Sequence, residues 1–413
     1  MLRGAILPAL MTALLVPAPA FAQAATSSAP VLVTRLLDRP IITPEVHPSV
    51  GPNIQGPSLI RVPDWVPGRL GRYYLYFADH KGRYIRLAFA DSVLGPWKIH
   101  VPGSLQLDGS FLLTDPPAGP AEALEKLRAT PKPANVSHDL FTEATTPHIA
   151  SPDVHVDEAN RRIIMYYHGL NGLQEQVTRV ATSRDGVRFD AMPEILGRTY
   201  FRVFPHRGFT YALAMPGQLY RSQNALSGFE RGPLLFNPNM RHSALLKRGN
   251  TLFVFWTQVG DAPESILVST IDLSNDWATW SPTAPIEVLR PQRQWEGADA
   301  PALPSVRSTA YGHVNQLRDP AVFEEDGRVY LLYAVAGESG IAIAEVTFTR
   351  GIVGAQVFED DKHENGRCGC LDSLVDDAVP CTGNDVAGPH HGDCADVHSS
   401  ERNREPRTHR WYV

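Results

Sequence analysis

Ionisable residues recur at one position of a repeated pattern in this chain. Asp153 and His155 belong to "SPDVHVDEANRRIIMYY", His242 to "MRHSALL", and Arg318 and Asp319 to "RDPAVFEEDGRVYLLY". Chance would not usually place so many such groups at the matching position of a repeat. Carboxylates and imidazoles can transfer protons near neutral pH, so the set predicts a site for general acid–base chemistry.

A second group of candidates lies outside these openings. Glu296 and Asp299 belong to "QWEGADAP", in which Trp295 could stack on a sugar ring or raise the pKa of Glu296 by desolvation. Asp79 and His80 end an aromatic strand and could reach the same site. The catalytic candidates are Asp153, Asp319, His242 and Glu296. The candidate substrate-binding residues are His155, Arg318, Trp295, Asp299, Asp79 and His80.

Each candidate also has an ordinary structural role open to it. Asp153 could be a hydrogen-bond partner at the start of a strand, and Asp319 could form a salt bridge to Arg318 or cap a turn. Glu296 could be a solvated loop acid, and Asp79 one half of a turn pair. The histidines could be buried groups whose hydrogen bonds are satisfied. The residue types alone leave both readings open.

The elements that must position these groups are five similar units of β-strands. Aromatic and β-branched runs such as "YYLYF", "IIMYYHG", "LFVFW" and "VYLLYAV" are dense in strand formers. Glycine-containing turns follow at the spacing of hairpins, for example at Asp185-Gly186 and Asp326-Gly327. The near-continuous apolar character of the strands predicts sheets that are covered on both faces.

Five such units predict an all-β fold, a five-bladed β-propeller, because a single four-stranded sheet cannot bury both of its faces alone and radial stacking can. A β-sandwich is the structural alternative. In a propeller the innermost strand of each blade lines a central channel. The segments that open the units should converge on this channel; they are 53–58, 151–155, 200–202, 239–243 and 318–320. Arg202, in the third of them, is a further substrate-binding candidate.

Two long insertions interrupt the regular spacing of the units. One covers about residues 102–147 and contains a predicted short helix, "PAEALEKLRA". The other, "VLRPQRQWEGADAPALPSVRSTAYGHVNQ", precedes the fifth unit. Long loops in a compact domain are usually functional or disordered. The second insertion is rich in Trp, Glu, Asp and His, which favours function.

The two ends of the chain differ from its body. Arg3, an apolar run and a small-residue site ending at Ala22 predict a signal peptide over residues 1–22, hence a secreted or periplasmic protein. We assign 23–45 to a linker and 46–350 to a single propeller domain. The tail, 351–413, holds all four cysteines and five histidines but no apolar periodicity, so we expect disorder there, with an ordered metal site as the alternative.

Charge and composition exclude some functions. A net charge of −6 gives no basic footprint for nucleic acid. After the signal peptide no segment is apolar for long enough to span a membrane. We expect a monomeric protein that works without a cofactor; the channel leaves room for a structural calcium ion.

The blade openings carry a resemblance. "SPDVHVDEANRRIIMYYHG" resembles the second-blade motif of family 43 glycoside hydrolases, the arabinanases and xylosidases, and "RDPAVFEEDGRVYLLYAV" is similar to Arg-Asp-Pro openings in that family and its five-bladed relatives. The likeness covers most of residues 50–347. It implies three carboxylates: a base, an aspartate that tunes a pKa, and a general acid.

The resemblance assigns roles unevenly. Asp153 matches the tuning aspartate, and Asp319 matches the kind of opening that carries the base, although on the last unit. The first unit opens "QGPSL" without an aspartate, and His242 stands near where a glutamate acid is expected. Some five-bladed relatives, the neoagarobiose hydrolases, use a histidine as acid. The resemblance therefore leaves the acid open among the candidates.

These observations predict a secreted glycoside hydrolase with an inverting acid–base mechanism, in which one protonated and one ionised group flank the scissile bond. The missing first-blade aspartate motivates a rival, a carbohydrate-binding propeller without catalysis. A phosphorylase or glycosyltransferase on the same fold, and a polysaccharide lyase that uses His and Tyr, are further alternatives. The sequence names neither the sugar nor the linkage.

Overall fold

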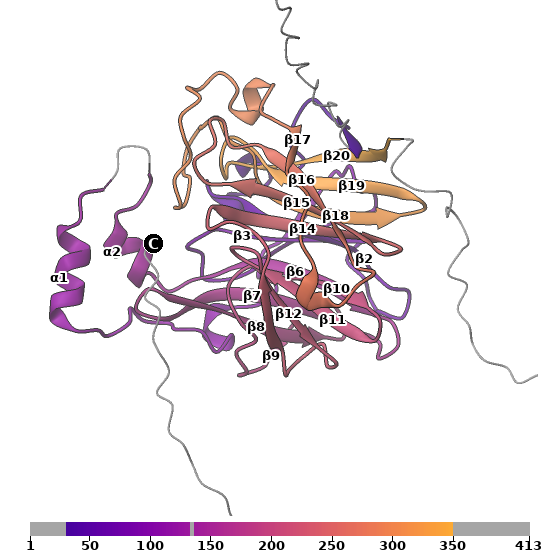
Figure 1. The fold of residues 1–413 in the computed structure, drawn as a ribbon, viewed down its shortest axis with the longest axis horizontal. Helices are drawn as coiled ribbons and strands as arrows, with labels where there is room; N and C mark the ends of the chain where they lie inside the picture. Colours follow the sequence, from indigo (N-terminus) through magenta and orange to yellow (C-terminus); the bar gives the residue numbers. More distant parts are fainter. Residues whose placement is uncertain (1–29, 133–135, 350–413) are drawn as a thin grey trace, which may run out of the picture. The chain divides into compact units, whose positions relative to one another are not determined.

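The strand-forming runs build five antiparallel sheets. Within residues 30–132 and 136–349, which the computed structural model describes, twenty strands form five sheets of four (Figure 1). Blade one contains β2 (Gln55–Arg61), β3 (Tyr73–Ala78), β4 (Arg86–Ala90) and β5 (Lys98–His100). Blade two contains β6 (Ile149–Asp157), β7 (Arg162–Gly172), β8 (Glu175–Ser183) and β9 (Asp190–Ala191).

The next two blades repeat this order. Blade three contains β10 (Arg202–His206), β11 (Phe209–Ala214), β12 (Gln218–Ser222) and β13 (Glu230–Leu234). Blade four contains β14 (Met240–Arg248), β15 (Thr251–Gln258), β16 (Ile266–Asp272) and β17 (Ile286–Leu289). In both blades each strand pairs with its neighbour in the chain, as in a simple meander.

Blade five joins the two ends of the propeller. It contains β18 (Arg318–Glu325), β19 (Arg328–Ala334), β20 (Ile341–Phe348) and, on its outer edge, β1 (Val31–Arg35). Strand β1 pairs antiparallel with β20, with Val31 opposite Phe348. The assignment of 23–45 to a linker is therefore wrong for residues 31–35, which complete a sheet. The predicted signal peptide and tail lie outside the described residues.

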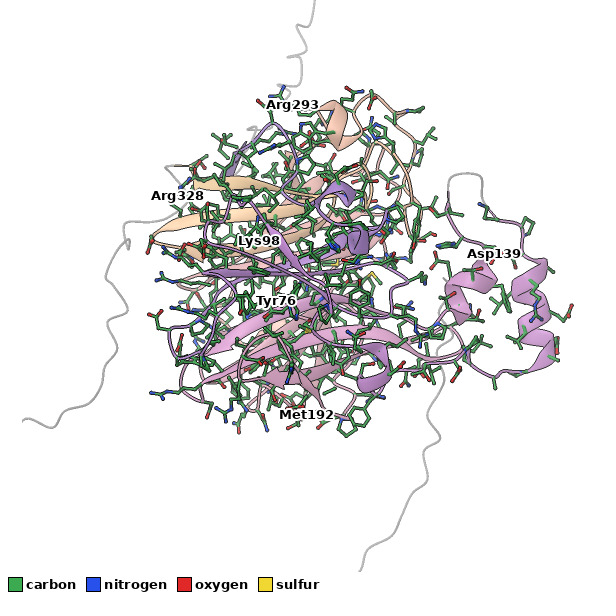
Figure 2. All side chains as sticks on the ribbon, turned by 180° about the vertical axis from the view of Figure 1, so that it is seen from behind. Tyr76, Lys98, Asp139, Met192, Arg293 and Arg328 are labelled. Carbon is green, nitrogen blue, oxygen red and sulfur yellow. The ribbon has the colours of Figure 1, made fainter. Side chains whose placement is uncertain are left out.

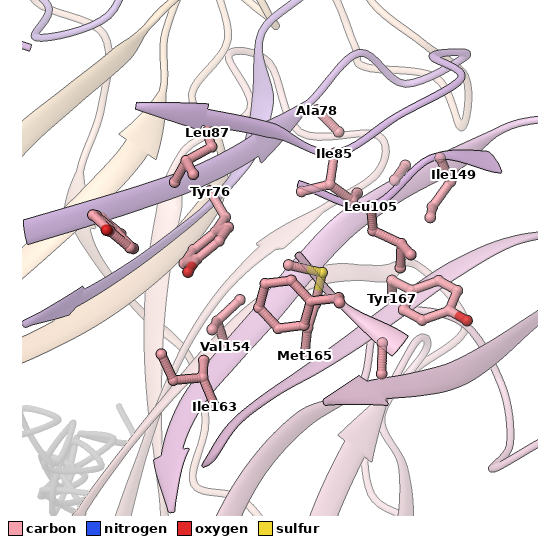
Figure 3. Packing of buried hydrophobic residues seen from close by; sticks show 14 of the residues in the cluster. Tyr76, Ala78, Ile85, Leu87, Leu105, Ile149, Val154, Ile163, Met165 and Tyr167 are labelled. Carbon is pink, nitrogen blue, oxygen red and sulfur yellow. The ribbon is translucent and has the colours of Figure 1, made fainter. Parts of the chain in front are cut away.

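Five apolar cores lie between the sheets, one between each pair of neighbouring blades. The core between blades one and two, for example, joins Tyr76 and Leu87 to Val154 and Met165 (Figure 3). The remaining four clusters fill the other gaps in the same way, including the one between blades five and one. Each sheet therefore buries both faces, which is the physical reason that the five units close into a ring. The predicted five-bladed propeller is confirmed.

The innermost strands are β2, β6, β10, β14 and β18, as predicted from the unit openings. Each of them pairs with only one strand of its own sheet and contacts the innermost strands of neighbouring blades. A β-bulge interrupts the pairing at the start of four of them, between Gln55 and Ser58 in β2 and at the matching places in β6, β14 and β18. Bulges of this kind redirect side chains and are frequent beside active sites.

Both insertions carry short helical segments. The predicted helix is confirmed as α1 (Ala121–Ala129), and a second helix, α2 (Leu140–Thr145), follows it. The Asp139 carboxylate caps α2 by accepting a hydrogen bond from the Thr142 backbone N–H at 2.7 Å. Both helices lie beside the sheets, at the side of the molecule where Asp139 is labelled (Figure 2). Single 3₁₀ turns are η1 (Pro44–Val46), η2 (Pro48–Val50), η3 (Leu107–Gly109), η4 (Trp277–Thr279) and η5 (Gln294–Glu296).

Gly56 explains why the first blade opens without an aspartate. Its φ is +61°, and a Cβ added there would lie 2.8 Å from the Ser151 Cα. We expect Gly56→Asp to lower the free energy of unfolding by about 2–4 kcal/mol, because backbone strain and overpacking add. Urea unfolding checks this.

The matched control is Gly249→Asp. Gly249 has a similar φ of +52°, but nothing lies within 4 Å of the added Cβ. Only the strain remains there, so we expect a loss of about 1 kcal/mol. Equal losses for the two variants would show that contact with Ser151 is not what excludes a side chain at Gly56.

Candidate active site in the central channel

The starts of the inner strands hold residues in a strained backbone conformation. Ser151, Tyr200 and Asp319 have φ values of +50°, +62° and +47°, a region that residues other than glycine rarely adopt. Together with Gly56 they occupy the equivalent place in four blades. Such strain costs free energy and clusters at functional sites, so it marks this end of the channel as the candidate site.

Asp319 lies at the centre of this end and is fully buried. Its Oδ1 accepts a hydrogen bond from the Tyr200 hydroxyl at 3.0 Å and lies 3.1 Å from His242 Nδ1. Its Oδ2 has no hydrogen-bond partner among the described residues. Burial raises the pKa of Asp319, and the negative charge of Glu338 adds to the effect. The carboxyl therefore favours its protonated form.

His242 supports the same protonation state of Asp319. Its Nδ1 accepts the backbone N–H of Asp319 at 3.2 Å, so this nitrogen carries no proton of its own. Burial lowers the pKa of His242 well below its usual value, and the nearby Arg241 adds to the effect. Two acceptor atoms 3.1 Å apart are compatible when a proton lies between them, and a protonated Asp319 supplies it.

Tyr200 contacts residues of several different blades across the channel. Its ring stacks between His168 and His242, with both centroid distances at 4.6 Å. Burial raises the pKa of Tyr200 well above 10, so the hydroxyl stays protonated and donates to Asp319. Gln55, which accepts from the Ser151 hydroxyl at 3.0 Å, completes the layer and leaves its Nε2 without a partner among the described residues.

Glu338 is a functional candidate that the sequence analysis missed. It lies in the hairpin between β19 and β20 and is fully buried. Its carboxylate accepts from Arg318 Nη1 at 2.8 Å and Asn53 Nδ2 at 2.7 Å, and it lies 3.3 Å from His80 Nδ1. Burial alone would raise the pKa of Glu338, but His80 and Arg318 outweigh it and lower the pKa. Glu338 is therefore ionised, whereas Asp319 in the same cluster favours its protonated form.

The two insertions meet over this end of the channel. The Ser308 carbonyl in the second insertion accepts from Arg241 Nη2 at 2.6 Å and from Arg318 Nη1 at 3.0 Å. Glu143 of α2 accepts from the Ser308 hydroxyl at 2.8 Å and from the Thr309 backbone N–H at 3.2 Å. Polar contacts thus join both insertions to each other and to the inner strands.

Asp153 lies further along its inner strand than the position that Asp319 occupies on β18. It pairs in register with Tyr166, two residues beyond the strained Ser151, so it matches Ala321 rather than Asp319. The inference that Asp153 and Asp319 open equivalent positions is therefore wrong by two residues. His155 Nε2 lies 2.7 Å from Asp153 Oδ2, and Arg202 Nη1 lies 3.6 Å from Asp153 Oδ1. Burial opposes ionisation, but His155 and Arg202 outweigh it and lower the pKa of Asp153.

Glu296 and Trp295 have structural roles that differ from the prediction. Glu296 is buried, forms a bidentate ion pair with Arg35 of β1 at 2.7 and 2.8 Å, and accepts from the Tyr333 hydroxyl at 3.1 Å. Trp295 packs against the core between blades four and five. Because both oxygens of Glu296 are occupied by these partners, it anchors the second insertion to blade five instead of facing Asp319.

The remaining candidates divide between the site and its surroundings. Asp299 is half exposed and pairs with His313 at 2.6 Å on the second insertion. Asp79 accepts from the Tyr311 hydroxyl at 2.9 Å and so helps to hold that insertion. The structure brings His80 and Arg318 to Glu338, and Arg318 forms its ion pairs with Glu338 and Glu264 rather than with Asp319.

A bound metal ion needs a group of suitable side chains. Among residues 30–132 and 136–349, no three or more His, Cys, Asp or Glu side chains are grouped to hold a metal ion. A structural calcium ion in the channel stays a prediction. The cysteines of the tail lie outside this part of the chain. No helix in the described ranges is long and apolar enough to cross a membrane.

The five four-stranded sheets define the chain as a five-bladed β-propeller. Solved structures similar to the chain include a family 43 β-xylosidase/α-arabinofuranosidase from a compost metagenome, 12% identical with a TM-score of 0.47, covering 77% of this chain and 96% of that one. A thermostable family-43 glycoside hydrolase is 13% identical with a TM-score of 0.46, covering 73% and 91%. At such identities the likeness concerns the fold alone.

The sequence comparison identifies the family. The chain is 35% identical over 320 residues to the uncharacterized protein R118 of Acanthamoeba polyphaga mimivirus, covering 71% of this chain and 83% of that protein. The chain belongs to the same family as this viral protein. No family model matches it.

Proposed function

We propose that this protein is a glycoside hydrolase in which Asp319 is the general acid and Glu338 the ionised carboxylate. The observation that carries the proposal is one buried cluster with two carboxyl groups whose pKa values shift in opposite directions. Such a pair assigns the acid and the base roles by environment. Glycoside cleavage needs one protonated and one ionised carboxyl group beside the scissile bond.

The two roles follow from the surroundings of each carboxyl group. Asp319 Oδ2 has no partner among the described residues, so it is the oxygen that the leaving glycosidic oxygen can approach. The carboxyl proton faces His242 from Oδ1 in the closed site, so it must move to Oδ2 before it is given to the leaving group. Glu338 keeps its charge through Arg318 and Asn53, so it can stabilise positive charge at the anomeric carbon and take a proton from the attacking water. Tyr200 and His242 hold Asp319 in place.

Substrate entry requires the cover to move. Displacing Ser308 from Arg241 and Arg318 would open the starts of β14 and β18 and free two guanidinium groups to bind sugar hydroxyls. Loops that exclude water from a closed site and open for substrate are common in enzymes. We also propose secretion, on the strength of the N-terminal signal pattern.

One observation favours a second function, a propeller that binds carbohydrate without cleaving it. Of the four strained openings only that of blade five carries a carboxyl group, because Gly56, Ser151 and Tyr200 occupy the others. This reading keeps the same site and ligand class but gives Asp319 a structural role.

A panel of polysaccharides and oligosaccharides tests the proposal. We expect new reducing ends from at least one glycan, and following the anomer of the first product by NMR tells inversion from retention. The panel includes xylans and arabinans, the polymers of the sugars named for the similar β-xylosidase/α-arabinofuranosidase. Binding without new reducing ends would favour the non-catalytic function, and neither binding nor cleavage would contradict both.

A further inference from the structure

A cavity of about 480 Å³ lies in the channel beyond the acid–base cluster. All five inner strands contribute to it, and on β2 and β6 its lining runs from Ser58 and Asp153 toward the strand ends at Arg61 and Glu158. Asp319, Glu338, His80 and His242 are not among the residues described as lining it. The cavity is therefore separate from the proposed catalytic site.

The inner end of this cavity holds three polar side chains in a connected group. Asp153 lies between His155, at 2.7 Å, and Arg202, at 3.6 Å. Arg202 is only 3% exposed; its Nε and Nη1 donate to the carbonyls of Ser243 and Pro152. Its Nη2 has no partner among the described residues. A buried guanidinium nitrogen without an acceptor is costly, which indicates that a ligand or water supplies one.

The charges at the outer rim are already neutralised or hydrogen-bonded. Asp64 pairs with Arg69 at 2.6 Å, and Glu324 pairs with Arg248 at 2.7 Å. Glu158 accepts from the Trp65 indole N–H at 2.6 Å. The rim therefore carries two carboxylates paired with arginines and one, Glu158, that is hydrogen-bonded to a neutral donor.

We propose that this cavity binds a neutral saccharide, at a second site distinct from Asp319. The Asp153 carboxylate would accept hydrogen bonds from sugar hydroxyls, and Arg202 Nη2 would donate one. A hydroxyl group both donates and accepts, so it matches this mixed set, whereas an anion would meet the charge of Asp153 and a cation that of Arg202. The volume lies within the range of roughly 300–1,000 Å³ that is typical of small-molecule sites.

Isothermal titration with D-glucose, D-galactose, D-xylose and L-arabinose tests this proposal on the full chain. We expect at least one of these sugars to bind, and Asp153→Asn and His155→Ala each to weaken binding about tenfold or more, because a hydrogen bond to a charged group is lost. Asp157→Asn is the matched control: Asp157 lies on the same strand, pairs with Arg162 and does not line the cavity. Circular dichroism confirms that each variant is folded.

Asp319→Asn separates the two sites. The Asp319→Asn variant should bind the sugar at the second site as the native protein does. The second-site proposal can therefore fail while the hydrolase proposal holds, and the hydrolase proposal can fail while the second-site proposal holds. Binding that Asp319→Asn abolishes and Asp153→Asn preserves would place the sugar at the catalytic cluster and overturn the proposal. The same holds if none of the four sugars binds, or if inorganic phosphate binds instead with the same dependence on Asp153 and His155.

Discussion

Replacing Asp319 with asparagine is expected to lower turnover of the cleaved glycan by about 10²–10⁴-fold, the usual contribution of a general acid. Asparagine keeps the size of the side chain and can still accept from the Tyr200 hydroxyl, but it has no proton to give. Initial rates of reducing-end release check this. An activated substrate with a good leaving group should restore the rate of the variant, because its departure needs no protonation.

The same variant should not lose stability at neutral pH. The pKa of Asp319 is higher in the folded than in the unfolded chain, so its contribution to stability is present below the unfolded pKa and lost as pH rises through the folded pKa. Asp319→Asn should therefore gain stability relative to the native protein as pH rises from about 4 to about 8, since it avoids a buried charge.

Asp299→Asn is the control for both measurements. Asp299 is half exposed and pairs with His313 on the second insertion, so its replacement should leave turnover unchanged. Because solvent screens this pair, the pH dependence of stability should change only slightly. If Asp319→Asn kept full turnover, or if an activated substrate failed to rescue it, Asp319 would not be the acid. The non-catalytic function would then remain.

The blades could be predicted from sequence because their signal is local. Runs such as "LFVFW" and "VYLLYAV" specify buried strands, and glycine turns specify where they reverse, so the five-fold count needs no knowledge of distant contacts. The strand openings, and with them His242, Arg318 and Asp319, follow from the same count. The count does not set the register within an opening. Asp153 follows the proline of its opening and Asp319 precedes the proline of its own, while both strands carry the bulge at the same place.

Glu338 could have been found by a rule of topology. In a meander of four strands, the hairpin between the second and third strands lies at the same end of the blade as the start of the first. Asp79 and His80 were selected from that hairpin in blade one, and Glu338 occupies the corresponding hairpin of blade five. Its signal in "VAGESG" is a single glutamate beside glycines, which by composition alone resembles any solvated turn.

The role of Glu296 could not have been predicted in this way. Its partner Arg35 lies 261 residues away, on a strand whose place in blade five depends on closure of the ring. Before that closure is known, a glutamate beside a tryptophan in a long insertion has the pattern of a tuned catalytic acid. Asp319 differs from Glu296 by its unpartnered Oδ2, a property that exists only in the folded chain.

Replacing Glu338 with glutamine is expected to lower the free energy of unfolding by about 3–5 kcal/mol, the usual cost of removing one partner of a buried ion pair. Arg318 would lose its 2.8 Å partner and retain Glu264 at 3.5 Å, while His80 would lose the carboxylate that faces its Nδ1. Because the pKa of Glu338 is lower in the fold than in the unfolded chain, its contribution is present above the unfolded pKa and lost as pH falls through the folded one. The difference in stability between native protein and variant should therefore be full near neutral pH and shrink in acid.

Urea unfolding at several pH values measures this difference, with Glu345→Gln as the matched control. Glu345 forms a bidentate pair with Arg328 on the surface, at 2.8 and 3.0 Å, so its loss should cost about 0–1 kcal/mol. Equal losses for the two variants, or a Glu338 effect that grows toward acid pH, would mean that Glu338 is not held ionised in the cluster, and the opposed pair of carboxyl groups on which the hydrolase proposal depends would be absent.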